Sequence, residues 1–280
     1  MPLQGIGRRF DPGTLHFKPS VRVNHEQTAR CDEDPSPTLL LMSLWLHVLD
    51  VPAAGLSVEI DRDEARHAFG ARRLGVGDLV TLFDGRGTLA SARLGEQRSR
   101  GGEVVVEVIE RSEAKPITPE ITIAFAVPKG DRLSTLLDGA TQAGVSRLVA
   151  IGCSRSVVDA DKLERSERCT RILFEATKVS KRAWTPELAA GGRLARVAQA
   201  EVARRSAIAI AHTTNGVALR TWSDSLAPTQ RRTVFIGPEG GFDDAELEAM
   251  RVLGATTVSL GPCVMRVEMA AIAATVLLRG

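Results

Sequence analysis

The chain has 280 residues, and 44% of them are hydrophobic, which is enough for one large domain or two ordinary ones with packed cores. Its formal net charge of +2 is too small to identify a nucleic-acid partner by itself. No apolar run reaches the roughly 18 residues that a membrane span needs, so we expect a cytoplasmic protein. The four cysteines are scattered, and no histidine stands at metal-ligand spacing. We therefore expect reduced thiols and no metal site.

The first 41 residues are polar, interrupted by proline and without hydrophobic periodicity, which favours disorder. Met42 lies just ahead of the first well-patterned segment. For residues 1–43 two alternatives therefore stay open. One is a disordered or irregular extension, and the other is a sequence that precedes the true start site.

Short apolar segments separated by turn residues follow over residues 44–114. We expect strands at 44–49, 56–60, 79–83, 88–94 and 103–109, with one helix over about 63–74. The turn Asp84-Gly-Arg-Gly87 separates two of these strands. Many short strands with glycine turns predict a small β-barrel. Pro116 and Pro119 mark a linker after it.

Strands and helices alternate over residues 115–280, which predicts the α/β fold class. We expect strands at 121–127, 147–151, 207–211, 233–236 and 256–260. Helices are expected after Arg132, over about 161–181 and 193–205, after Asp243, and over 270–278. The strands are continuously apolar, which favours a parallel sheet covered on both faces. The last helix is apolar almost all round, so it should be buried in a core or a subunit interface.

A glycine–proline turn follows each of the last two expected strands. The first is Gly237-Pro-Glu-Gly-Gly-Phe242, and the second is Gly261-Pro262. In open α/β sheets small ligands bind at the carboxyl ends of the strands, and Gly240-Gly241 allow backbone to approach a ligand closely. Asp243 with Glu246 three residues later fits a helix N-terminal capping box. The sequence therefore predicts a cofactor pocket built from main chain.

These turns, with the surrounding residues, form a pattern that is known from one protein family. The strings are Ile236–Phe242 and Leu260-Gly-Pro followed by Arg266-Val-Glu-Met-Ala270, preceded by Lys129-Gly-Asp-Arg132, Gly144-Val145, Ser154–Val158, Glu175-Ala176, Ser180, Arg182 and Pro186. Phe83–Gly87 and Glu64, His67, Arg73 and Leu74 fit the amino-terminal part. In this order, over residues 45–280, the chain resembles the bacterial 16S rRNA uridine-N3 methyltransferases, the RsmE family of the SPOUT class.

The resemblance implies two domains and a cofactor. Residues 44–114 would form a PUA-like β-barrel that binds RNA, and residues 115–280 a SPOUT methyltransferase domain whose chain end threads a trefoil knot, a rare exception to unknotted topology. The family binds S-adenosyl-L-methionine in the knot, acts on small-subunit rRNA and works as a homodimer. Val179 and Met269 depart from the family pattern. They leave open a different RNA or base as substrate, or an RNA-binding relative without catalysis.

Three groups of site residues follow from the motifs. The expected cofactor-binding residues are His212, Ile236, Gly237, Pro238, Glu239, Gly240, Gly241, Leu260, Gly261, Val264, Met265 and Arg266. The expected catalytic residues are Arg182, Arg266 and Glu268, and the expected RNA-binding residues are Arg72, Arg73, Lys129, Arg132, Arg155 and Arg182. A cation near O2 and O4 of the uracil anion should lower the barrier, and arginine suits that role but is a poor base.

Several of these residues have a simpler reading that also stays open. Glu268 is either a general base or a side chain that pairs with Arg266 or caps the final helix. Arg168, Arg171, Glu175, Lys178 and Arg182 fall in one helical stripe, which is either an RNA-binding face or an ordinary solvated face. Arg155, flanked by two serines, either grips a phosphate or stands in a surface loop.

Overall fold

The computed structural model describes residues 43–97, 104–156, 163, 166–213 and 216–280. Residues 1–42 lie outside the described residues. Both alternatives for residues 1–43 therefore stay predictions. No helix in the described part of the chain is long and apolar enough to cross a membrane. Within the same residues, no cluster of three or more His, Cys, Asp or Glu side chains is placed to hold a metal ion.

The amino-terminal half of the described chain forms a five-stranded sheet in the order β1-β3-β4-β5-β2. Its elements are β1 (Leu44–His47), β2 (Ser57–Ile60), α2 (Arg62–Arg66), the π-helix η1 (His67–Ala71), β3 (Leu79–Phe83), β4 (Thr88–Gln97) and β5 (Val104–Glu113). Only β1 and β3 run parallel. Buried Leu46, Leu82 and Val106 belong to its hydrophobic core.

The sequence predicts a barrel for this segment, and the structure shows a sheet with β1 and β2 at its edges. Among the described strands, β1 pairs only with β3 and β2 only with β5, so no ladder closes the sheet. Register shifts after Ser91 and Leu94 in β4 mark bulges or irregularities, features that bend a strand.

The carboxy-terminal half contains a seven-stranded sheet in the order β10-β12-β9-β11-β6-β7-β8, and every pair in it is parallel. The strands are β6 (Ile121–Ala126), β7 (Arg147–Gly152), β8 (Glu187–Arg193), β9 (Ala207–Ala211), β10 (Val217–Ala218), β11 (Arg232–Ile236) and β12 (Thr256–Ser259). The predicted parallel sheet is thereby confirmed. The central strands β6 and β11 are buried along their whole length, as continuously apolar strands require.

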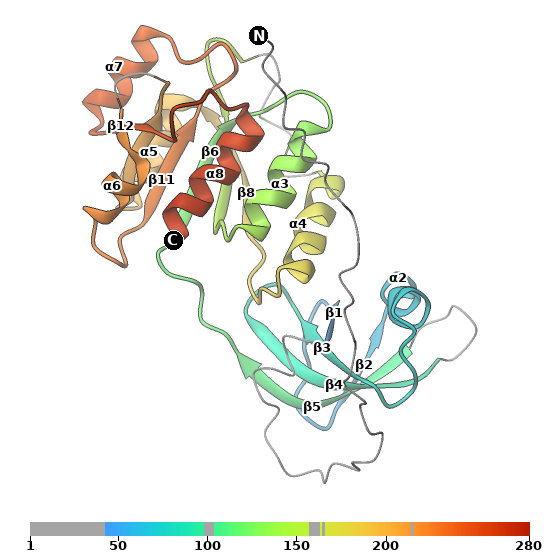
Figure 1. Ribbon diagram of the computed structural model, residues 1–280. Coiled ribbons are helices and arrows are strands. Elements are labelled where there is room, and N and C mark those ends of the chain that lie inside the picture. Colours follow the sequence, from blue (N-terminus) through green and yellow to red (C-terminus); the bar gives the residue numbers. More distant parts are fainter. Residues whose placement is uncertain (1–42, 98–103, 157–162, 164–165, 214–215) are drawn as a thin grey trace, which may run out of the picture. The chain divides into compact units, whose positions relative to one another are not determined.

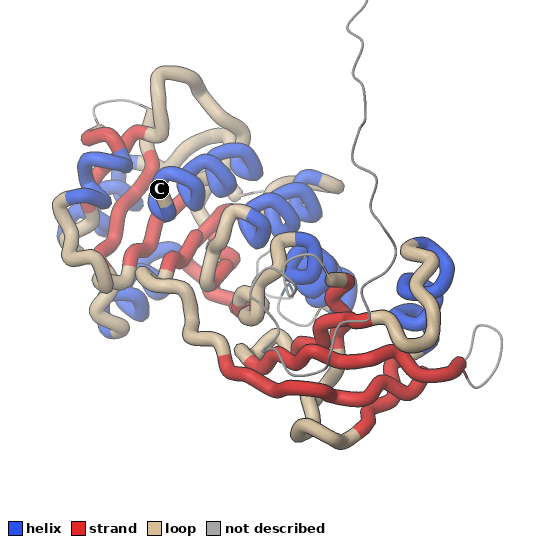
Figure 2. The backbone as a smooth tube through the Cα atoms, turned by 60° about the horizontal axis from the view of Figure 1, so that its bottom comes forward, coloured by secondary structure: helices blue, strands red, loops and turns tan. Residues whose placement is uncertain are grey.

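Helices cover this sheet on both faces (Figures 1 and 2). They are α3 (Arg132–Gln142), α4 (Glu167–Val179), α5 (Leu194–Ala203), α6 (Leu219–Asp224), α7 (Asp244–Val252) and α8 (Val267–Arg279). Side chains of α3, α4, α6 and α8 share one hydrophobic core with one face of the sheet, while α5 and α7 pack on the other face. The sheet is therefore the middle of three layers.

Several boundaries differ from the sequence expectation. Helix α4 is predicted over about 161–181 but extends from Glu167 to Val179, with Ser166 as its N-cap. It ends because Lys181 has a φ of 53°, in the left-handed region that stops a helix. The sequence prediction omits β8, β10 and α6. Strand β8 has the sequence ELAAGGR, without a β-branched or aromatic residue, and so it carries little strand signal.

The turn Asp84–Gly87 of the five-stranded sheet contacts the segment after α4. Backbone N–H groups of Gly87 and Thr185 donate to the carbonyls of Ala183 and Gly85, at 3.0 and 2.9 Å. A Cβ on Gly87 would lie 2.5 Å from the Trp184 ring, and its φ is 104°. This glycine is required both by its backbone conformation and by the close approach of the ring.

Candidate functional site

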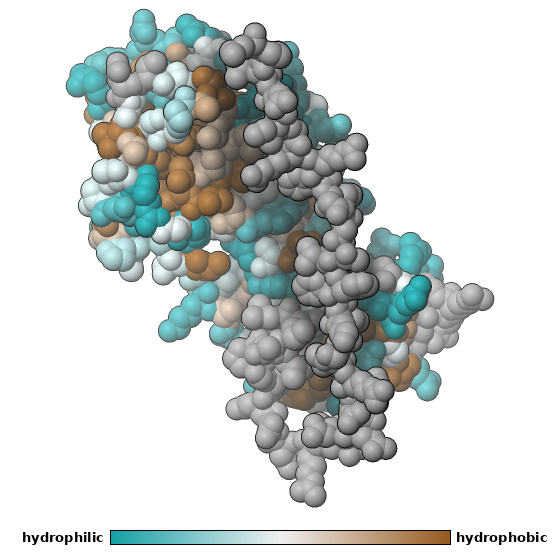
Figure 3. Space-filling model, in the orientation of Figure 1, coloured by the Kyte–Doolittle hydropathy of each residue, from teal (hydrophilic) through white to brown (hydrophobic). Residues whose placement is uncertain are grey.

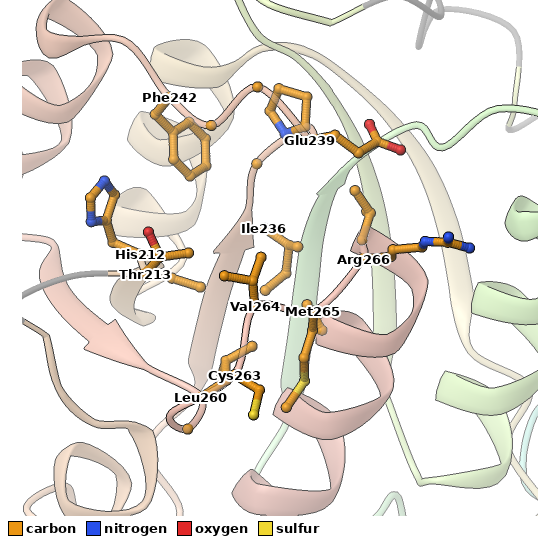
Figure 4. A pocket seen from close by; sticks show the side chains of 18 of the residues that line it. His212, Thr213, Ile236, Glu239, Phe242, Leu260, Cys263, Val264, Met265 and Arg266 are labelled. Atoms are coloured by element: carbon orange, nitrogen blue, oxygen red, sulfur yellow. The ribbon is translucent and has the colours of Figure 1, made fainter.

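A cavity of about 560 Å³ lies at the carboxyl ends of β9, β11 and β12 (Figure 4). Because β9 stands between β11 and β12 in the sheet, the loops that follow these three parallel strands meet at one edge. The lining residues are Arg155, Ala211, His212, Thr213, Ile236, Gly237, Pro238, Glu239, Gly240, Gly241, Phe242, Leu260, Gly261, Pro262, Cys263, Val264, Met265, Arg266, Val267 and Ala270. Such an edge is where open α/β sheets bind ligands.

The first wall of the cavity is the loop between β11 and α7. Gly241 has a φ of 70°, and its N–H donates to the Pro238 carbonyl at 2.8 Å, which makes a tight turn. A Cβ on Gly237 would lie 2.8 Å from the Phe242 ring, so only glycine allows that ring to pack there. The predicted capping box at the start of α7 is confirmed, since Asp243 accepts from the Glu246 N–H and Glu246 accepts from the Asp243 N–H.

The second wall is the loop from Leu260 to Arg266, between β12 and α8. Gly261 has a φ of 144°, which other residues rarely adopt. Arg266 stands at the N-cap position of α8 in an extended conformation, without a side-chain cap. Figure 4 shows His212 and Thr213 at one end of the cavity and Glu239 and Arg266 at the other. The walls thus offer mostly apolar side chains and exposed backbone groups.

All twelve residues expected to bind the cofactor line this one cavity. Further residues line the cavity that were not among the expected cofactor-binding residues: Ala211, Thr213, Phe242, Pro262, Cys263, Val267 and Ala270. Phe242, Pro262, Val267 and Ala270 stand inside the quoted motifs and Cys263 directly follows one, so taking every residue of each loop would have found them. Ala211 and Thr213 flank His212 at the end of β9, and only the sheet order brings that strand beside β11 and β12.

Two arginines, one at the start of α3 and one in the loop after β7, hold the first wall. Arg132, the first residue of α3, pairs with Glu239 at 2.6 Å, and Arg155 donates to the Gly240 carbonyl at 2.6 Å. The pKa of Glu239 is lowered, first by its own backbone N–H and then by Arg132, with Lys129 adding its charge. The carboxylate is therefore ionised, and positive charge lies at this end of the cavity.

Arg182 does not reach the cavity. It is 8% exposed, and it donates to the carbonyls of Thr141 and Val145, both at 2.7 Å, at the end of α3. Burial, together with Arg279, lowers the pKa of Arg182 to about 10. Because α3 starts beside the carboxyl end of β6 and returns to the start of β7, its last turn lies at the opposite edge of the sheet from the cavity. The expectation of a substrate contact by Arg182 is therefore not supported by its position.

The residues of the basic stripe on the long helix do not share one environment in the structure. Lys178 pairs with Glu64 at 2.7 Å and with Glu175 at 2.9 Å, so its ammonium group is engaged between two carboxylates. Arg182 stands beyond the end of α4 and is not part of a helical stripe. Arg72 and Arg73, expected to contact RNA, are exposed after η1 and not part of the cavity lining.

Glu268 lies in the first turn of α8 and is 6% exposed. Its Oε2 atom is buried and has no hydrogen-bond partner, and no ion pair joins Glu268 to Arg266 in the described part of the chain. Neither the predicted pairing nor a cap of the final helix is therefore present. Val179 and Met269, the two departures from the family pattern, lie outside the cavity lining.

Comparisons with known proteins agree with this architecture. The family model of the RNA methyltransferase domain matches residues 115–279, and that of the RNA methyltransferase PUA domain matches residues 60–110. A ribosomal RNA small subunit methyltransferase E from Mycobacterium bovis is 30% identical over 237 residues, which cover 82% of this chain and 89% of the relative. One from Bacillus subtilis is 26% identical over 219 residues, which cover 75% of this chain and 85% of the relative.

Two solved structures share the fold. A ribosomal RNA small subunit methyltransferase E from Neisseria gonorrhoeae, bound to S-adenosyl methionine, has a TM-score of 0.71 at 22% identity, over 83% of this chain and 95% of that one. A protein from Legionella pneumophila, described as a methyltransferase in complex with the bound cofactor SAM, has a TM-score of 0.73 at 25% identity, over 84% of this chain and 96% of that one.

A parallel α/β sheet with a backbone-lined cavity at its carboxyl edge, joined to a PUA domain, defines the class of two-domain RNA methyltransferases. The extent of the matches then identifies the particular group. The chain belongs to the ribosomal RNA small subunit methyltransferase E family. The resemblance drawn from the motifs is confirmed.

Proposed function

We propose that the protein transfers a methyl group from S-adenosyl-L-methionine to N3 of a uridine in small-subunit rRNA. The observation that carries this proposal is the single cavity that unites all twelve expected cofactor residues, in a chain of this family. With this substrate, we expect the protein to act in the cytoplasm.

The cavity fits a nucleoside cofactor in size and in chemistry. Its volume of about 560 Å³ lies within the range of small-molecule sites, about 300–1,000 Å³. Gly240, Gly241 and Gly261 leave room for main-chain hydrogen bonds to a base and a ribose, and Leu260 and Ile236 supply apolar walls. When bound, the cofactor supplies an electrophilic methyl group on a sulfonium ion.

The residues of this chain would position the base and stabilise its charge. Once N3 loses its proton, the negative charge spreads onto O2 and O4, and a preorganised cation there contributes about 3 kcal/mol of barrier lowering. Arg266 lines the cavity and is the arginine that we assign to this role. Glu268 is not itself a lining residue, but its buried Oε2 lacks a partner one residue after the lining Val267, and we keep it as the proposed proton acceptor. Turnover of Glu268→Gln at saturating cofactor tests this role.

The finer architecture is part of the proposal. We infer that the chain end threads a trefoil knot, because α8 packs against β6, β11, α3 and α6 directly after the second cavity loop. A crystal structure that traces residues 233–280 around a neighbouring loop, and not through it, would contradict the knot. We also infer a homodimer in solution, which is argued with its own test in the Discussion.

The central test compares two valines replaced by tryptophan. Val264 lines the cavity and is 81% exposed, and Val252 on α7 is 71% exposed and distant from it. Tryptophan at 264 fills cavity space without backbone strain, so Val264→Trp should weaken the binding of S-adenosyl-L-methionine by about tenfold or more, a loss near 1.4 kcal/mol. Val252→Trp should bind it like the wild type. Isothermal titration calorimetry measures both affinities.

The second arm is a methylation assay on rRNA and on assembled small subunits, with the modified nucleotide located by mass spectrometry. Methylation at uridine N3 is the expected result. A methyl group on another base or RNA would redirect the proposal to a different substrate. Cofactor binding absent from the wild-type protein, with RNA still retained, would instead identify a non-catalytic RNA-binding relative.

A further inference from the structure

The cofactor loop is joined to a segment that the motifs assigned to RNA. Arg155 lies in the loop after β7, and its Nη1 donates to the Gly240 carbonyl at 2.6 Å. A Cβ placed on Gly240 would lie 3.3 Å from Cδ and 3.4 Å from Cβ of Arg155, so the arginine side chain runs along the Gly240 backbone. The contact therefore involves the stem of Arg155 as well as its guanidinium group.

A second contact joins the same two loops. One carboxylate oxygen of Glu246 accepts from the Asp243 N–H at 3.0 Å, and the other accepts from the Ser154 N–H at 2.8 Å. Glu246 thus caps α7 and fixes the loop after β7 at once. Two hydrogen bonds between Cys153 and Ser156, each 2.9 Å long, form a turn in that loop. Arg155 is held at the cavity from both of its flanks.

We propose that Arg155 is a positioning residue for the cofactor loop. With Glu246 it forms a clasp that keeps the Glu239–Gly240 backbone in the conformation that receives the cofactor, and Arg155 is not primarily a phosphate contact. This inference rests on the proposed function. The physical reason is preorganisation, because a loop that binds through main-chain groups loses affinity when those groups must first be ordered.

The experiment measures cofactor affinity and RNA kinetics for Arg155→Ala, Arg155→Gln and Arg155→Lys. Arg155→Ala should raise the dissociation constant for S-adenosyl-L-methionine about tenfold, as expected for the loss of a charge-assisted hydrogen bond. The KM for RNA and the kcat at saturating cofactor should change much less. Arg155→Gln should recover part of the affinity, because a neutral amide N–H can still donate to the Gly240 carbonyl but does not attract phosphate.

The matched control is Arg251→Ala. Arg251 makes a comparable exposed contact, with Glu248 at 2.7 Å on α7, away from the cavity. It should leave both cofactor affinity and RNA kinetics unchanged. Double substitution of Arg155 and Glu246 by alanine should cost less than the sum of the single substitutions, since both support the same loop.

Two outcomes would overturn the clasp. The first is an Arg155→Ala protein with wild-type cofactor affinity. The second is weaker RNA binding whose logarithmic salt dependence loses about one unit of slope, with no rescue by Arg155→Gln, as a phosphate contact predicts. Failure of the proposed function is distinguishable, because the wild-type protein itself would then bind no cofactor.

Discussion

Single charged side chains in this protein take their roles from partners far away in the sequence. Arg132 meets Glu239 across 107 positions, and Lys178 meets Glu64 across 114. Helical spacing shows which residues share a face, but it does not show which of them are engaged by such partners. For this reason helical spacing alone does not separate Lys178, paired with Glu64 and Glu175, from a free cation of an RNA-binding face.

Asp84, in the turn after β3, accepts hydrogen bonds from two backbone N–H groups. Burial would raise its pKa, but hydrogen bonds from the backbone of Arg86 and Thr88, at 2.8 and 3.0 Å, outweigh burial and lower it. A carboxylate with a depressed pKa in the folded state stabilises above its unfolded pKa and loses that contribution as the pH falls through the folded value.

Asp84→Asn should therefore lower the free energy of unfolding by about 1–2 kcal/mol at pH 7. The difference from the wild type should shrink as the pH falls below about 4. Urea unfolding at both pH values measures it, with exposed Asp50→Asn as the control. A deficit of the same size at both pH values would show that the charge of Asp84 is not what stabilises the turn.

At the scale of elements, specific side-chain hydrogen bonds hold the ends of helices. The box at the start of α7 follows from Asp243 and Glu246 in sequence, because both partners lie within one turn. The end of α3 depends instead on two arginines from other elements. Arg182 donates to Thr141 and Val145, and Arg279 of α8 donates to the Gly144 carbonyl at 2.8 Å.

Arg182→Met should therefore act on stability and not on binding. It keeps the apolar stem but removes the guanidinium donor from both carbonyls, and the Thr141 carbonyl keeps only the Gly144 N–H at 3.0 Å among the described donors, so the free energy of unfolding should fall by about 2 kcal/mol. Affinity of the folded protein for S-adenosyl-L-methionine should stay at the wild-type value. Chemical denaturation followed by calorimetry checks both. A fully stable variant without turnover would return Arg182 to the substrate site.

At the scale of the whole molecule, one side of α8 is apolar and exposed. Met269 is 51% exposed and Val276 is exposed on the same helix, and Figure 3 shows hydrophobic side chains gathered over this region. Exposed apolar patches of this kind mark interaction surfaces. A second copy of the chain is the proposed occupant.

Met269→Glu should convert the proposed dimer into a monomer, because two carboxylates would be buried across a symmetric interface. Light scattering coupled to gel filtration measures the mass. Val252→Glu, on exposed α7, should leave the dimer intact. A wild-type protein that is already monomeric at micromolar concentration would refute the dimer.

Local sequence patterns are enough to predict the α/β class of the carboxy-terminal half and most of the cavity. Continuous apolar runs such as Ile121–Ala126 predict buried parallel strands, and the two glycine–proline turns locate the cofactor loops, because these signals are local to a few neighbouring residues. Strand β8 and the open edges of the five-stranded sheet left no such local signal.

Which charged groups face the cavity depends on tertiary packing. Arg155 and Arg182 look alike in sequence, yet one lies along Gly240 and the other is buried beneath the end of α3. The order of the strands brings His212 beside the loops after β11 and β12. Long-range packing makes this choice, because burial and hydrogen-bond geometry depend on neighbours that local patterns do not encode.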